Sequence, residues 1–270
     1  MGNVVVVGVD GSSASLAAVD EAAQAAQRRR AELRVVYAFD WPVRPLYAPL
    51  DTAPLRALVK EAAQRAKSVA PQLEVSEAVL TGEVVSVLEA ESRAADLIVV
   101  GSRGRGGFIG MLVGSKAVTL AAYSHCPVMV VRGDEPDPTR PILLAVDGSP
   151  MGEKAVDFAF AEASLRGAEL VGVHAWMPDR APAGAGTETA ERLLARALAG
   201  RAEKYPDVTV RHDVISGEVR EVLIETSKAA QLTVVGARGR GGFLGLLLGS
   251  VSQALLHHAH SPVAVVRGND

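Results

Sequence analysis

The chain has 270 residues, of which 49% are apolar and 4% aromatic, and its formal net charge at pH 7 is −3. This length accommodates one large domain or two of ordinary size, and each half could bury an aliphatic core of its own. The slightly acidic balance argues against a general binder of nucleic acids or membrane surfaces. In addition, no uninterrupted apolar run approaches the roughly 20 residues that a membrane-spanning helix needs.

The cysteine content and the N-terminus indicate the compartment. The single cysteine, Cys126, rules out an intramolecular disulfide and fits a reducing environment, and we expect it to be buried rather than reactive. The N-terminus continues at once into an apolar run at residues 4–9, without the basic segment and cleavage site of a signal peptide. A cytoplasmic location is therefore expected.

Apolar runs alternate with helix-forming segments along the first half of the chain. β-Branched runs without polar alternation are typical of strands buried on both faces of a parallel sheet. Strands are expected at residues 4–9, 33–39, 73–80, 97–100 and 128–131, and helices at residues 14–30, 54–69, 83–95 and 115–124. This alternation predicts an α/β fold, in which helices cover both faces of a parallel sheet.

The second half of the chain repeats this order of elements. An apolar run ends in the motif Asp-Gly-Ser at Asp10 and again at Asp147. In the second copy Ser149 is followed by proline, and an N-cap with proline at the first helical position predicts a helix start there. Because a proline-rich, charged segment lies between the copies, we expect two domains, at residues 1–136 and 137–270.

A glycine-rich segment follows the fourth expected strand of each half. The first reads GSRGRGGFIGMLVGS from Gly101 to Ser115, the second reads GARGRGGFLGLLLGS from Gly236 to Ser250, and both keep the spacing G-x2-G-x9-G-S. Glycine lets the backbone approach a ligand closely, and the amides of such a loop and of the following helix start attract phosphate. Each segment is therefore predicted to hold phosphate groups. The alternative is a solvated loop whose arginines face water.

This pattern resembles the nucleotide-binding signature of the universal stress protein family, and nearly the whole chain resembles a tandem member of it. The resemblance implies two doubly wound five-stranded parallel sheets of strand order 3-2-1-4-5, a fold of the adenine nucleotide alpha hydrolase-like type. That order places the first and fourth strands side by side, so Asp10 and Gly101 would meet at one crevice. Ligands of open α/β sheets bind at such a switch point, beyond the carboxyl ends of the strands.

The resemblance also implies that each crevice binds ATP. The carboxylates of Asp10 and Asp147 would lie at the adenine and ribose end, although an aspartate in such a turn can simply accept from its own backbone. The expected ATP-binding residues of the first half are Gly8, Asp10, Ala38, Gly101, Ser102, Arg103, Gly104, Arg105, Gly106, Gly107, Gly114, Ser115 and Lys116. Those of the second half are Ala145, Asp147, Ala175, Gly236, Ala237, Arg238, Gly239, Arg240, Gly241, Gly242, Gly249, Ser250, Val251 and Ser252.

The two copies differ at the phosphate end. Lys116 could add charge there or point to water, and the first copy has alanine where the second has Ser252. Backbone amides bind phosphate whatever the side chain, so we expect both copies to bind, with relative affinities left open.

The resemblance implies a regulator or sensor in stress adaptation, with two ATP sites per chain and Mg²⁺ carried by the phosphates. No catalytic residue is assigned, because no histidine, glutamate or lysine placed as a general base recurs in both copies. A slow ATPase, or an adenylyl- or phosphoryl-transfer enzyme using the same clefts, stays open as the alternative. The histidines at His257, His258 and His260 do not belong to the repeat, so no metal site is expected. Homodimerisation is a further expectation, whereas nucleic-acid and membrane partners are not expected.

Overall fold

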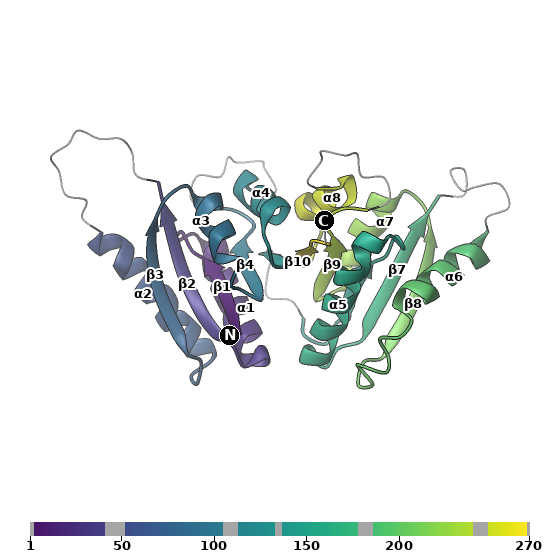
Figure 1. The fold of residues 1–270 in the computed structure, drawn as a ribbon, viewed down its shortest axis with the longest axis horizontal. Helices are drawn as coiled ribbons and strands as arrows, with labels where there is room; N and C mark the ends of the chain where they lie inside the picture. Colours follow the sequence, from purple (N-terminus) through teal and green to yellow (C-terminus); the bar gives the residue numbers. More distant parts are fainter. Residues whose placement is uncertain are drawn as a thin grey trace. The chain divides into compact units, whose positions relative to one another are not determined.

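The structure is a computed structural model that describes residues 3–40, 52–104, 113–132, 137–177, 186–239 and 248–268. The chain divides into two compact units, Met1–Val131 (unit 1) and Arg132–Asp270 (unit 2), whose ribbons are drawn in Figure 1. The predicted domain boundary after residue 136 adjoins residues outside the described part of the chain, and it stays a prediction.

Unit 1 contains one parallel sheet, and helices connect its strands along the chain. Its sheet has the order β3-β2-β1-β4-β5, and every pairing that joins these neighbours is parallel. The strands are β1 (Val4–Gly8), β2 (Glu32–Phe39), β3 (Val75–Thr81), β4 (Leu97–Gly101) and β5 (Val128–Val131). The helices are α1 (Ser13–Arg29), α2 (Ala53–Val69), α3 (Val84–Glu91) and α4 (Ser115–Tyr123). The predicted α/β class and strand order are therefore confirmed for this unit.

Unit 2 repeats the arrangement. Its sheet has the order β8-β7-β6-β9-β10, again with parallel neighbours. The strands are β6 (Ile142–Ala145), β7 (Leu170–Trp176), β8 (Val210–Ser216), β9 (Leu232–Gly236) and β10 (Val263–Val266). The helices are α5 (Glu153–Arg166), α6 (Thr187–Leu198), α7 (Val219–Thr226) and α8 (Ser250–His258), with 3-10 turns η1 (Pro150–Gly152) and η3 (Ser227–Ala229). The tandem fold is confirmed.

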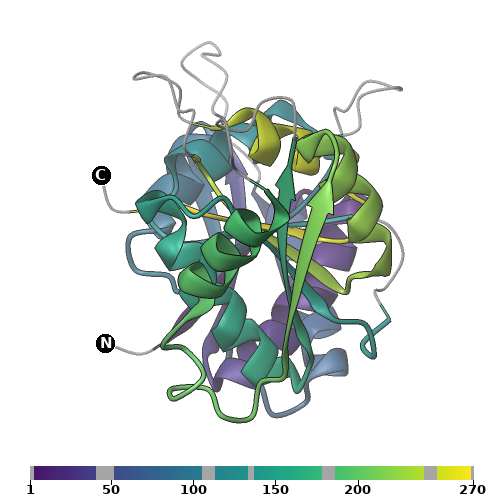
Figure 2. The ribbon, with the colours of Figure 1, turned by 90° about the vertical axis from the view of Figure 1, so that its right-hand side faces the viewer.

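The direction of the crossovers places the helices on two faces of each sheet. The chain runs outward from the first strand to the third and then returns to the fourth and fifth. Right-handed crossovers therefore place the first two helices on one face and the last two on the other. Accordingly α1 contacts α2, and α3 contacts α4. In unit 2, Figure 2 shows α6 and α7 on opposite sides of β7 and β8.

Aliphatic side chains fill the core of each unit. In β1, for example, Val5, Val6 and Val7 are all buried, as expected for a strand covered on both faces. Buried alanines along α1, such as Ala18 and Ala22, let the helix backbone approach the sheet closely. The small side chains thus bring the helix start near the carboxyl edge of the sheet, where the predicted site lies.

Two local predictions were wrong. The third helix was expected at residues 83–95, but α3 ends at Glu91, where the Ser92 hydroxyl donates to the Glu89 carbonyl and accepts from the His125 amide. A helix start was expected directly after Ser149, but the chain first forms η1, and α5 begins only at Glu153. The Ser149 side chain makes no capping hydrogen bond there.

Candidate functional site

The turn after β1 holds the carboxylate of Asp10 above the start of α1. Asp10 Oδ1 accepts hydrogen bonds from the Ser12 amide at 3.0 Å and from the Ser12 hydroxyl at 2.6 Å. Gly11 has φ of 79°, a left-handed conformation that glycine adopts without a Cβ penalty. Ser12 in turn caps α1 by accepting from the Ser15 amide at 3.2 Å. The expected contact of the aspartate with its own turn is therefore present.

The glycine-rich loop after β4 closes onto this turn. A Cβ added to Gly104 would lie 2.5 Å from Asp10 Oδ2, so only glycine lets the loop backbone touch the carboxylate in this way. The Arg103 carbonyl oxygen lies 3.2 Å from the Ser12 hydroxyl oxygen, so it is a second, longer acceptor beside Asp10 for the one hydroxyl hydrogen. At the start of the loop, a Cβ on Gly101 would meet the Ala14 carbonyl group at 2.6 Å. The predicted meeting of Asp10 and the loop is thus found within unit 1.

Unit 2 contains the same contact between carboxylate and loop. Asp147 Oδ1 accepts from the Ser149 amide at 2.9 Å, and Gly148 has φ of 71°. A Cβ on Gly239 would lie 2.5 Å from Asp147 Oδ2, the same distance as for the equivalent atoms of unit 1. Each crevice therefore combines one carboxylate with a glycine backbone directly beside it.

The far end of each loop leads into a helix N-terminus. Gly114 and Gly249 occupy the N-cap positions of α4 and α8, and their amides donate to the carbonyls of Ser102 and Ala237, each at 2.8 Å. The first helical residues, the serines that complete the motif, are exposed. Since the N-terminal amides of a helix and its dipole favour negative charge, each helix start can receive an anion.

Ala38 and Ala175 lie where the second strand of each unit extends past the first. The Val36 carbonyl accepts from the Val9 amide at 2.9 Å, beyond the last paired residue of β1. Peptide groups two residues apart in a strand point to the same side, so those of Ala38 face the crevice beyond β1. In unit 2 the Val173 carbonyl accepts from the Val146 amide at 2.8 Å, which orients Ala175 in the same way.

The remaining predicted residues differ in exposure. Ser102 and Ala237 are buried, Arg103 is exposed, and Gly8, Ala145, Arg238 and Val251 are intermediate. Lys116 lies on α4 in a groove that Glu83 and Ser115 also line. Ser252 is buried, with its hydroxyl within hydrogen-bond distance of the carbonyls of Ala237 and Gly249, so it holds α8 to the loop. Arg105, Gly106, Gly107, Arg240, Gly241 and Gly242 lie outside the described residues.

Comparison with known proteins gives the family. The sequence profile of the universal stress protein family matches residues 1–132 and 138–267. The chain belongs to this family. A universal stress protein of Mycobacterium tuberculosis strain H37Rv is 40% identical over 285 residues, covering 97% of this chain and 96% of its own. Another from Mycolicibacterium smegmatis is 39% identical with the same coverage.

Solved structures agree on the fold. The crystal structure of a universal stress protein from Archaeoglobus fulgidus matches with a TM-score of 0.75 at 22% identity, covering 99% of this chain and 97% of that chain. The likeness at this identity concerns the fold alone. The universal stress protein family thus accounts for both units, each with its own crevice.

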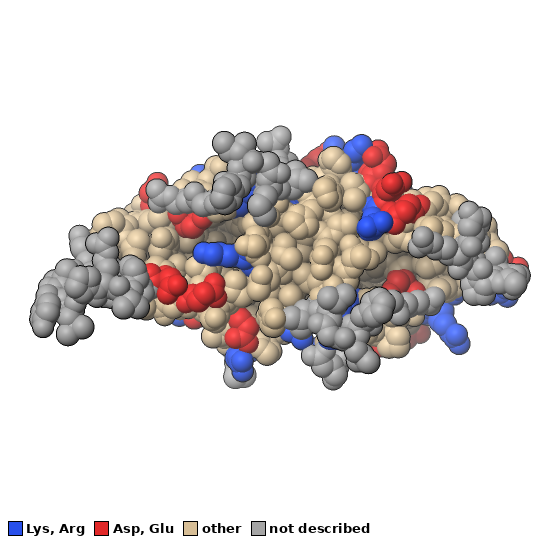
Figure 3. All heavy atoms as spheres, turned by 90° about the horizontal axis from the view of Figure 1, so that it is seen from above, with Lys and Arg blue, Asp and Glu red and all other residues tan. Residues whose placement is uncertain are grey.

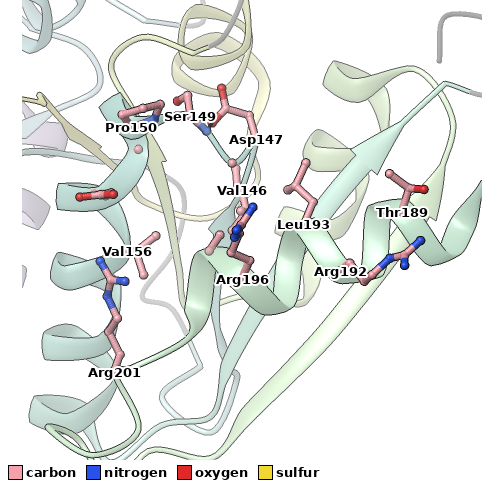
Figure 4. A pocket seen from close by; sticks show the side chains of 15 residues that line it. Val146, Asp147, Ser149, Pro150, Val156, Thr189, Arg192, Leu193, Arg196 and Arg201 are labelled. Atoms are coloured by element: carbon pink, nitrogen blue, oxygen red, sulfur yellow. Dashed lines mark hydrogen bonds between the residues drawn. The ribbon is translucent and has the colours of Figure 1, made fainter. Parts of the chain in front are cut away.

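In this universal stress protein, unit 2 also contains a cavity that sequence reasoning missed. The cavity has a volume of about 680 Å³ and lies beside Asp147, between the N-terminal end of α5 and helix α6. Figure 4 shows Leu193 and Arg196 pointing from α6 toward Val146, whereas Arg192 points away. The sequence differs there from the first copy, with a proline after Ser149 in place of a second serine, but that difference does not by itself indicate a cavity.

Other titratable groups lie outside the crevices. Burial raises the pKa of the Cys126 thiol to about 11, so the thiol stays protonated at neutral pH, as expected for a buried rather than a reactive cysteine. His174, which was expected only to pack, has its Nδ1 2.7 Å from the Val146 carbonyl oxygen. Among the described residues, no three His, Cys, Asp or Glu side chains are grouped so that they could hold a metal ion.

Charge is distributed rather than gathered on the face seen in Figure 3. There the described Lys and Arg side chains are interspersed with Asp and Glu side chains. No helix in the described ranges is long and apolar enough to cross a membrane.

Proposed function

We propose that the chain is an ATP-binding regulatory protein of the universal stress protein family, with one nucleotide site in each unit. The site lies at the carboxyl edge of each sheet, between the first and fourth strands. ATP occupancy would bias the conformation or partner choice of the chain during stress adaptation. The single observation that carries the proposal is the close contact of Gly104 with Asp10, repeated by Gly239 with Asp147.

This contact supports a nucleotide because it joins two complementary groups in one crevice. A carboxylate accepts from ribose hydroxyls or from the adenine amine, whereas a glycine backbone offers amides and leaves room for phosphate. The exposed starts of α4 and α8 supply further amides at the other end of each loop. Peptide groups of Ala38 and Ala175 supply donors and acceptors for the edge of a base. The same arrangement in both units supports two sites per chain.

Regulation rather than catalysis is proposed because no histidine, glutamate or lysine placed as a general base recurs among the described residues of both crevices. Lys116 lines one groove together with Glu83 and Ser115. Mg²⁺ would enter with the phosphates, whose oxygens it prefers, rather than through protein ligands. A cytoplasmic location and self-association of two chains belong to the same proposal, and light scattering of the purified chain measures the latter.

Calorimetric titration with ATP in the presence of Mg²⁺ tests the proposal. The wild-type chain should take up two equivalents, and the double variant Gly104→Glu/Gly239→Glu should take up none, because each new carboxylate occupies the loop beside an existing one. The matched control is Gly186→Glu, since a Cβ at Gly186 meets no heavy atom within 4 Å. That control adds one glutamate away from both loops, against two in the double variant, and should keep both equivalents.

Two results would contradict the proposal. Undiminished ATP uptake by the folded double variant would show that the glycine loops are not part of the ATP site. A wild-type chain without saturable uptake at millimolar ATP would show that ATP is not a ligand of this chain. The enzyme alternative is tested separately. If the chain converts many equivalents of ATP when incubated with Mg²⁺, the proposal of a purely regulatory role fails.

A further inference from the structure

We propose that unit 2 has a second binding site, for a small organic carboxylate with an apolar body, in the cavity between α5 and α6. The cavity shares Ala145 and Asp147 with the proposed nucleotide crevice, and its other lining residues do not belong to that crevice. The inference rests on three features of the residues that line this cavity: a buried hydroxyl, a helix start and a cation.

The buried hydroxyl belongs to Ser149. This residue is 9% exposed, lines the cavity, and its Oγ has no hydrogen-bond partner among the residues that the structure describes. A buried hydroxyl without a partner is costly, so such groups usually meet a protein atom, a water or a ligand. An acceptor oxygen in the cavity would satisfy it.

The helix start is that of α5, a helix of 14 residues. Its first turn is preceded by η1, and Pro150, Gly152 and Glu153 all line the cavity. Because the dipole of a helix is positive at its N-terminus, this wall favours an anion. Ser149 and α5 therefore favour the same kind of atom, a negatively charged oxygen.

The cation is Arg196 on α6. Of the three arginines that line the cavity, Arg201 is paired with Asp157 at 3.0 Å, and Arg192 lies 3.6 Å from Glu188. Arg196 makes no ion pair within the described part of the chain, and Figure 4 shows its guanidinium directed toward the end of β6. A guanidinium binds a carboxylate with two parallel hydrogen bonds, so Arg196 is the natural partner of the ligand.

The rest of the lining limits the size and charge of the ligand. Val146, Val156 and Leu193 supply apolar surface, and the volume of 680 Å³ is in the range of small-molecule sites. The carboxylates of Asp147 and Glu153 also line the cavity and repel anions, so every negative charge beyond the one that Arg196 can pair would be unfavourable. A monoanion with an apolar body therefore fits better than a polyanion.

Unit 1 lacks both polar groups of this site. There the hydroxyl of Ser12, the counterpart of Ser149, is bonded to Asp10 and to the Ser15 amide. Arg196 is replaced by Glu61, which precedes β3 by as many residues as Arg196 precedes β8. The site should therefore occur once per chain.

Calorimetric titration of the full chain with benzoate, without nucleotide, tests the proposal. We expect saturable uptake of one equivalent, and no uptake of benzyl alcohol, which lacks the charge. Arg196→Gln should weaken benzoate binding about tenfold through loss of a charged hydrogen-bond pair. Ser149→Ala should weaken it by about threefold to tenfold. The matched controls Arg192→Gln and Ser12→Ala should leave it unchanged.

Several results would overturn the proposal. The first is the absence of saturable benzoate uptake, and the second is uptake that Arg196→Gln and Ser149→Ala leave intact. The third is a loss of benzoate affinity in Arg192→Gln as large as that in Arg196→Gln, which would indicate that any positive charge on the surface attracts benzoate. Phenyl phosphate binding more tightly than benzoate would overturn the assignment to a monoanion. Arg196 is exposed, so its replacement leaves the core intact, and circular dichroism verifies the fold of each variant. Since nucleotide is absent, failure here says nothing against ATP binding.

Discussion

The turns after β1 and β6 start from the same Asp-Gly-Ser motif and continue into their helices differently. In unit 1, Ser12 caps α1 directly, and the Ser15 hydroxyl donates to the Ser12 carbonyl at 2.9 Å. In unit 2, a 3-10 turn intervenes, Ser149 caps nothing, and glycine stands at position 152 in place of the serine. The aspartate nevertheless meets its glycine loop at the same distance in both units.

This comparison separates what the motif determines from what its neighbours determine. The motif positions the carboxylate, because both aspartates accept from the amide two residues later. The residues that follow it decide how closely the helix approaches the fourth strand of the sheet. In unit 1 the backbone of Ala14 fills the space beside Gly101, whereas in unit 2 the space beside Gly236 is more open. Four predictions test this division, beginning with the largest expected effect.

Alanine in place of Gly101 should be far more damaging than alanine in place of Gly236. The added Cβ would lie 2.6 Å from backbone atoms of Ala14 in unit 1, but 3.2 Å from the nearest atom, the Arg238 carbonyl oxygen, in unit 2. Overpacking against backbone costs about 3 kcal/mol, and the milder contact about 1 kcal/mol or less. Amide hydrogen exchange of α1 and α5 measures each unit in the intact chain. Equal losses of protection would contradict the difference between the two helix starts.

Alanine in place of Gly104 or Gly239 should have equal effects in the two units. Each Cβ would lie 2.5 Å from a carboxylate oxygen at the end of a side chain, so the aspartate can move and the fold is kept. Nucleotide affinity of the altered unit should then fall about tenfold, or roughly 1.4 kcal/mol. Two-site calorimetric titration with ATP measures the loss. Unchanged affinity in either variant would show that the contact of loop and carboxylate does not support binding in that unit.

Much of the fold could be predicted from the sequence, because buried strands and glycine spacing are local signals. The apolar run at Val4–Gly8 and the motif at Asp10 locate the first strand and its turn without tertiary information. The strand order came from the family resemblance, and from it followed the meeting of Asp10 with the loop of Gly104. Both predictions concern the carboxyl edge of the sheet.

The cavity of unit 2 could not be predicted in the same way. Ser149 followed by proline suits a cap, and only the structure shows that η1 leaves the hydroxyl uncapped. Whether a 3-10 turn or an α-helix follows depends on packing of α5 against the sheet, which no local pattern records. Arg196 is one of several arginines near α6. It differs from the others in making no ion pair within the described residues, and that difference depends on its neighbours in three dimensions.

Removal of the serine hydroxyls should give a smaller difference in stability between the two turns. Ser12→Ala deletes the cap of α1 and should lower the free energy of unfolding by about 1 kcal/mol, whereas Ser149→Ala deletes no cap and should be nearly neutral. Urea denaturation of both variants, followed by circular dichroism, provides the comparison. A loss in Ser149→Ala as large as that in Ser12→Ala would mean that the hydroxyl of Ser149 stabilises the start of α5 after all.

The smallest effect concerns a feature that both units share, the glutamates Glu83 and Glu218 that cap α3 and α7. Burial alone would raise the pKa of each carboxyl, but hydrogen bonds from the backbone at the helix start outweigh it, and the pKa of each lies below the ordinary 4.5. A depressed pKa stabilises the fold above the ordinary value, and this contribution is lost as the pH falls through the folded-state pKa. Because both groups are partly exposed, each should contribute only about 0.5 kcal/mol. Urea denaturation between pH 7 and pH 3 should show a shallower acid loss in Glu83→Gln and in Glu218→Gln than in the wild-type chain. Since the two caps are alike, the two variants should change by similar amounts, and a change in only one would extend the difference between the units to these helices.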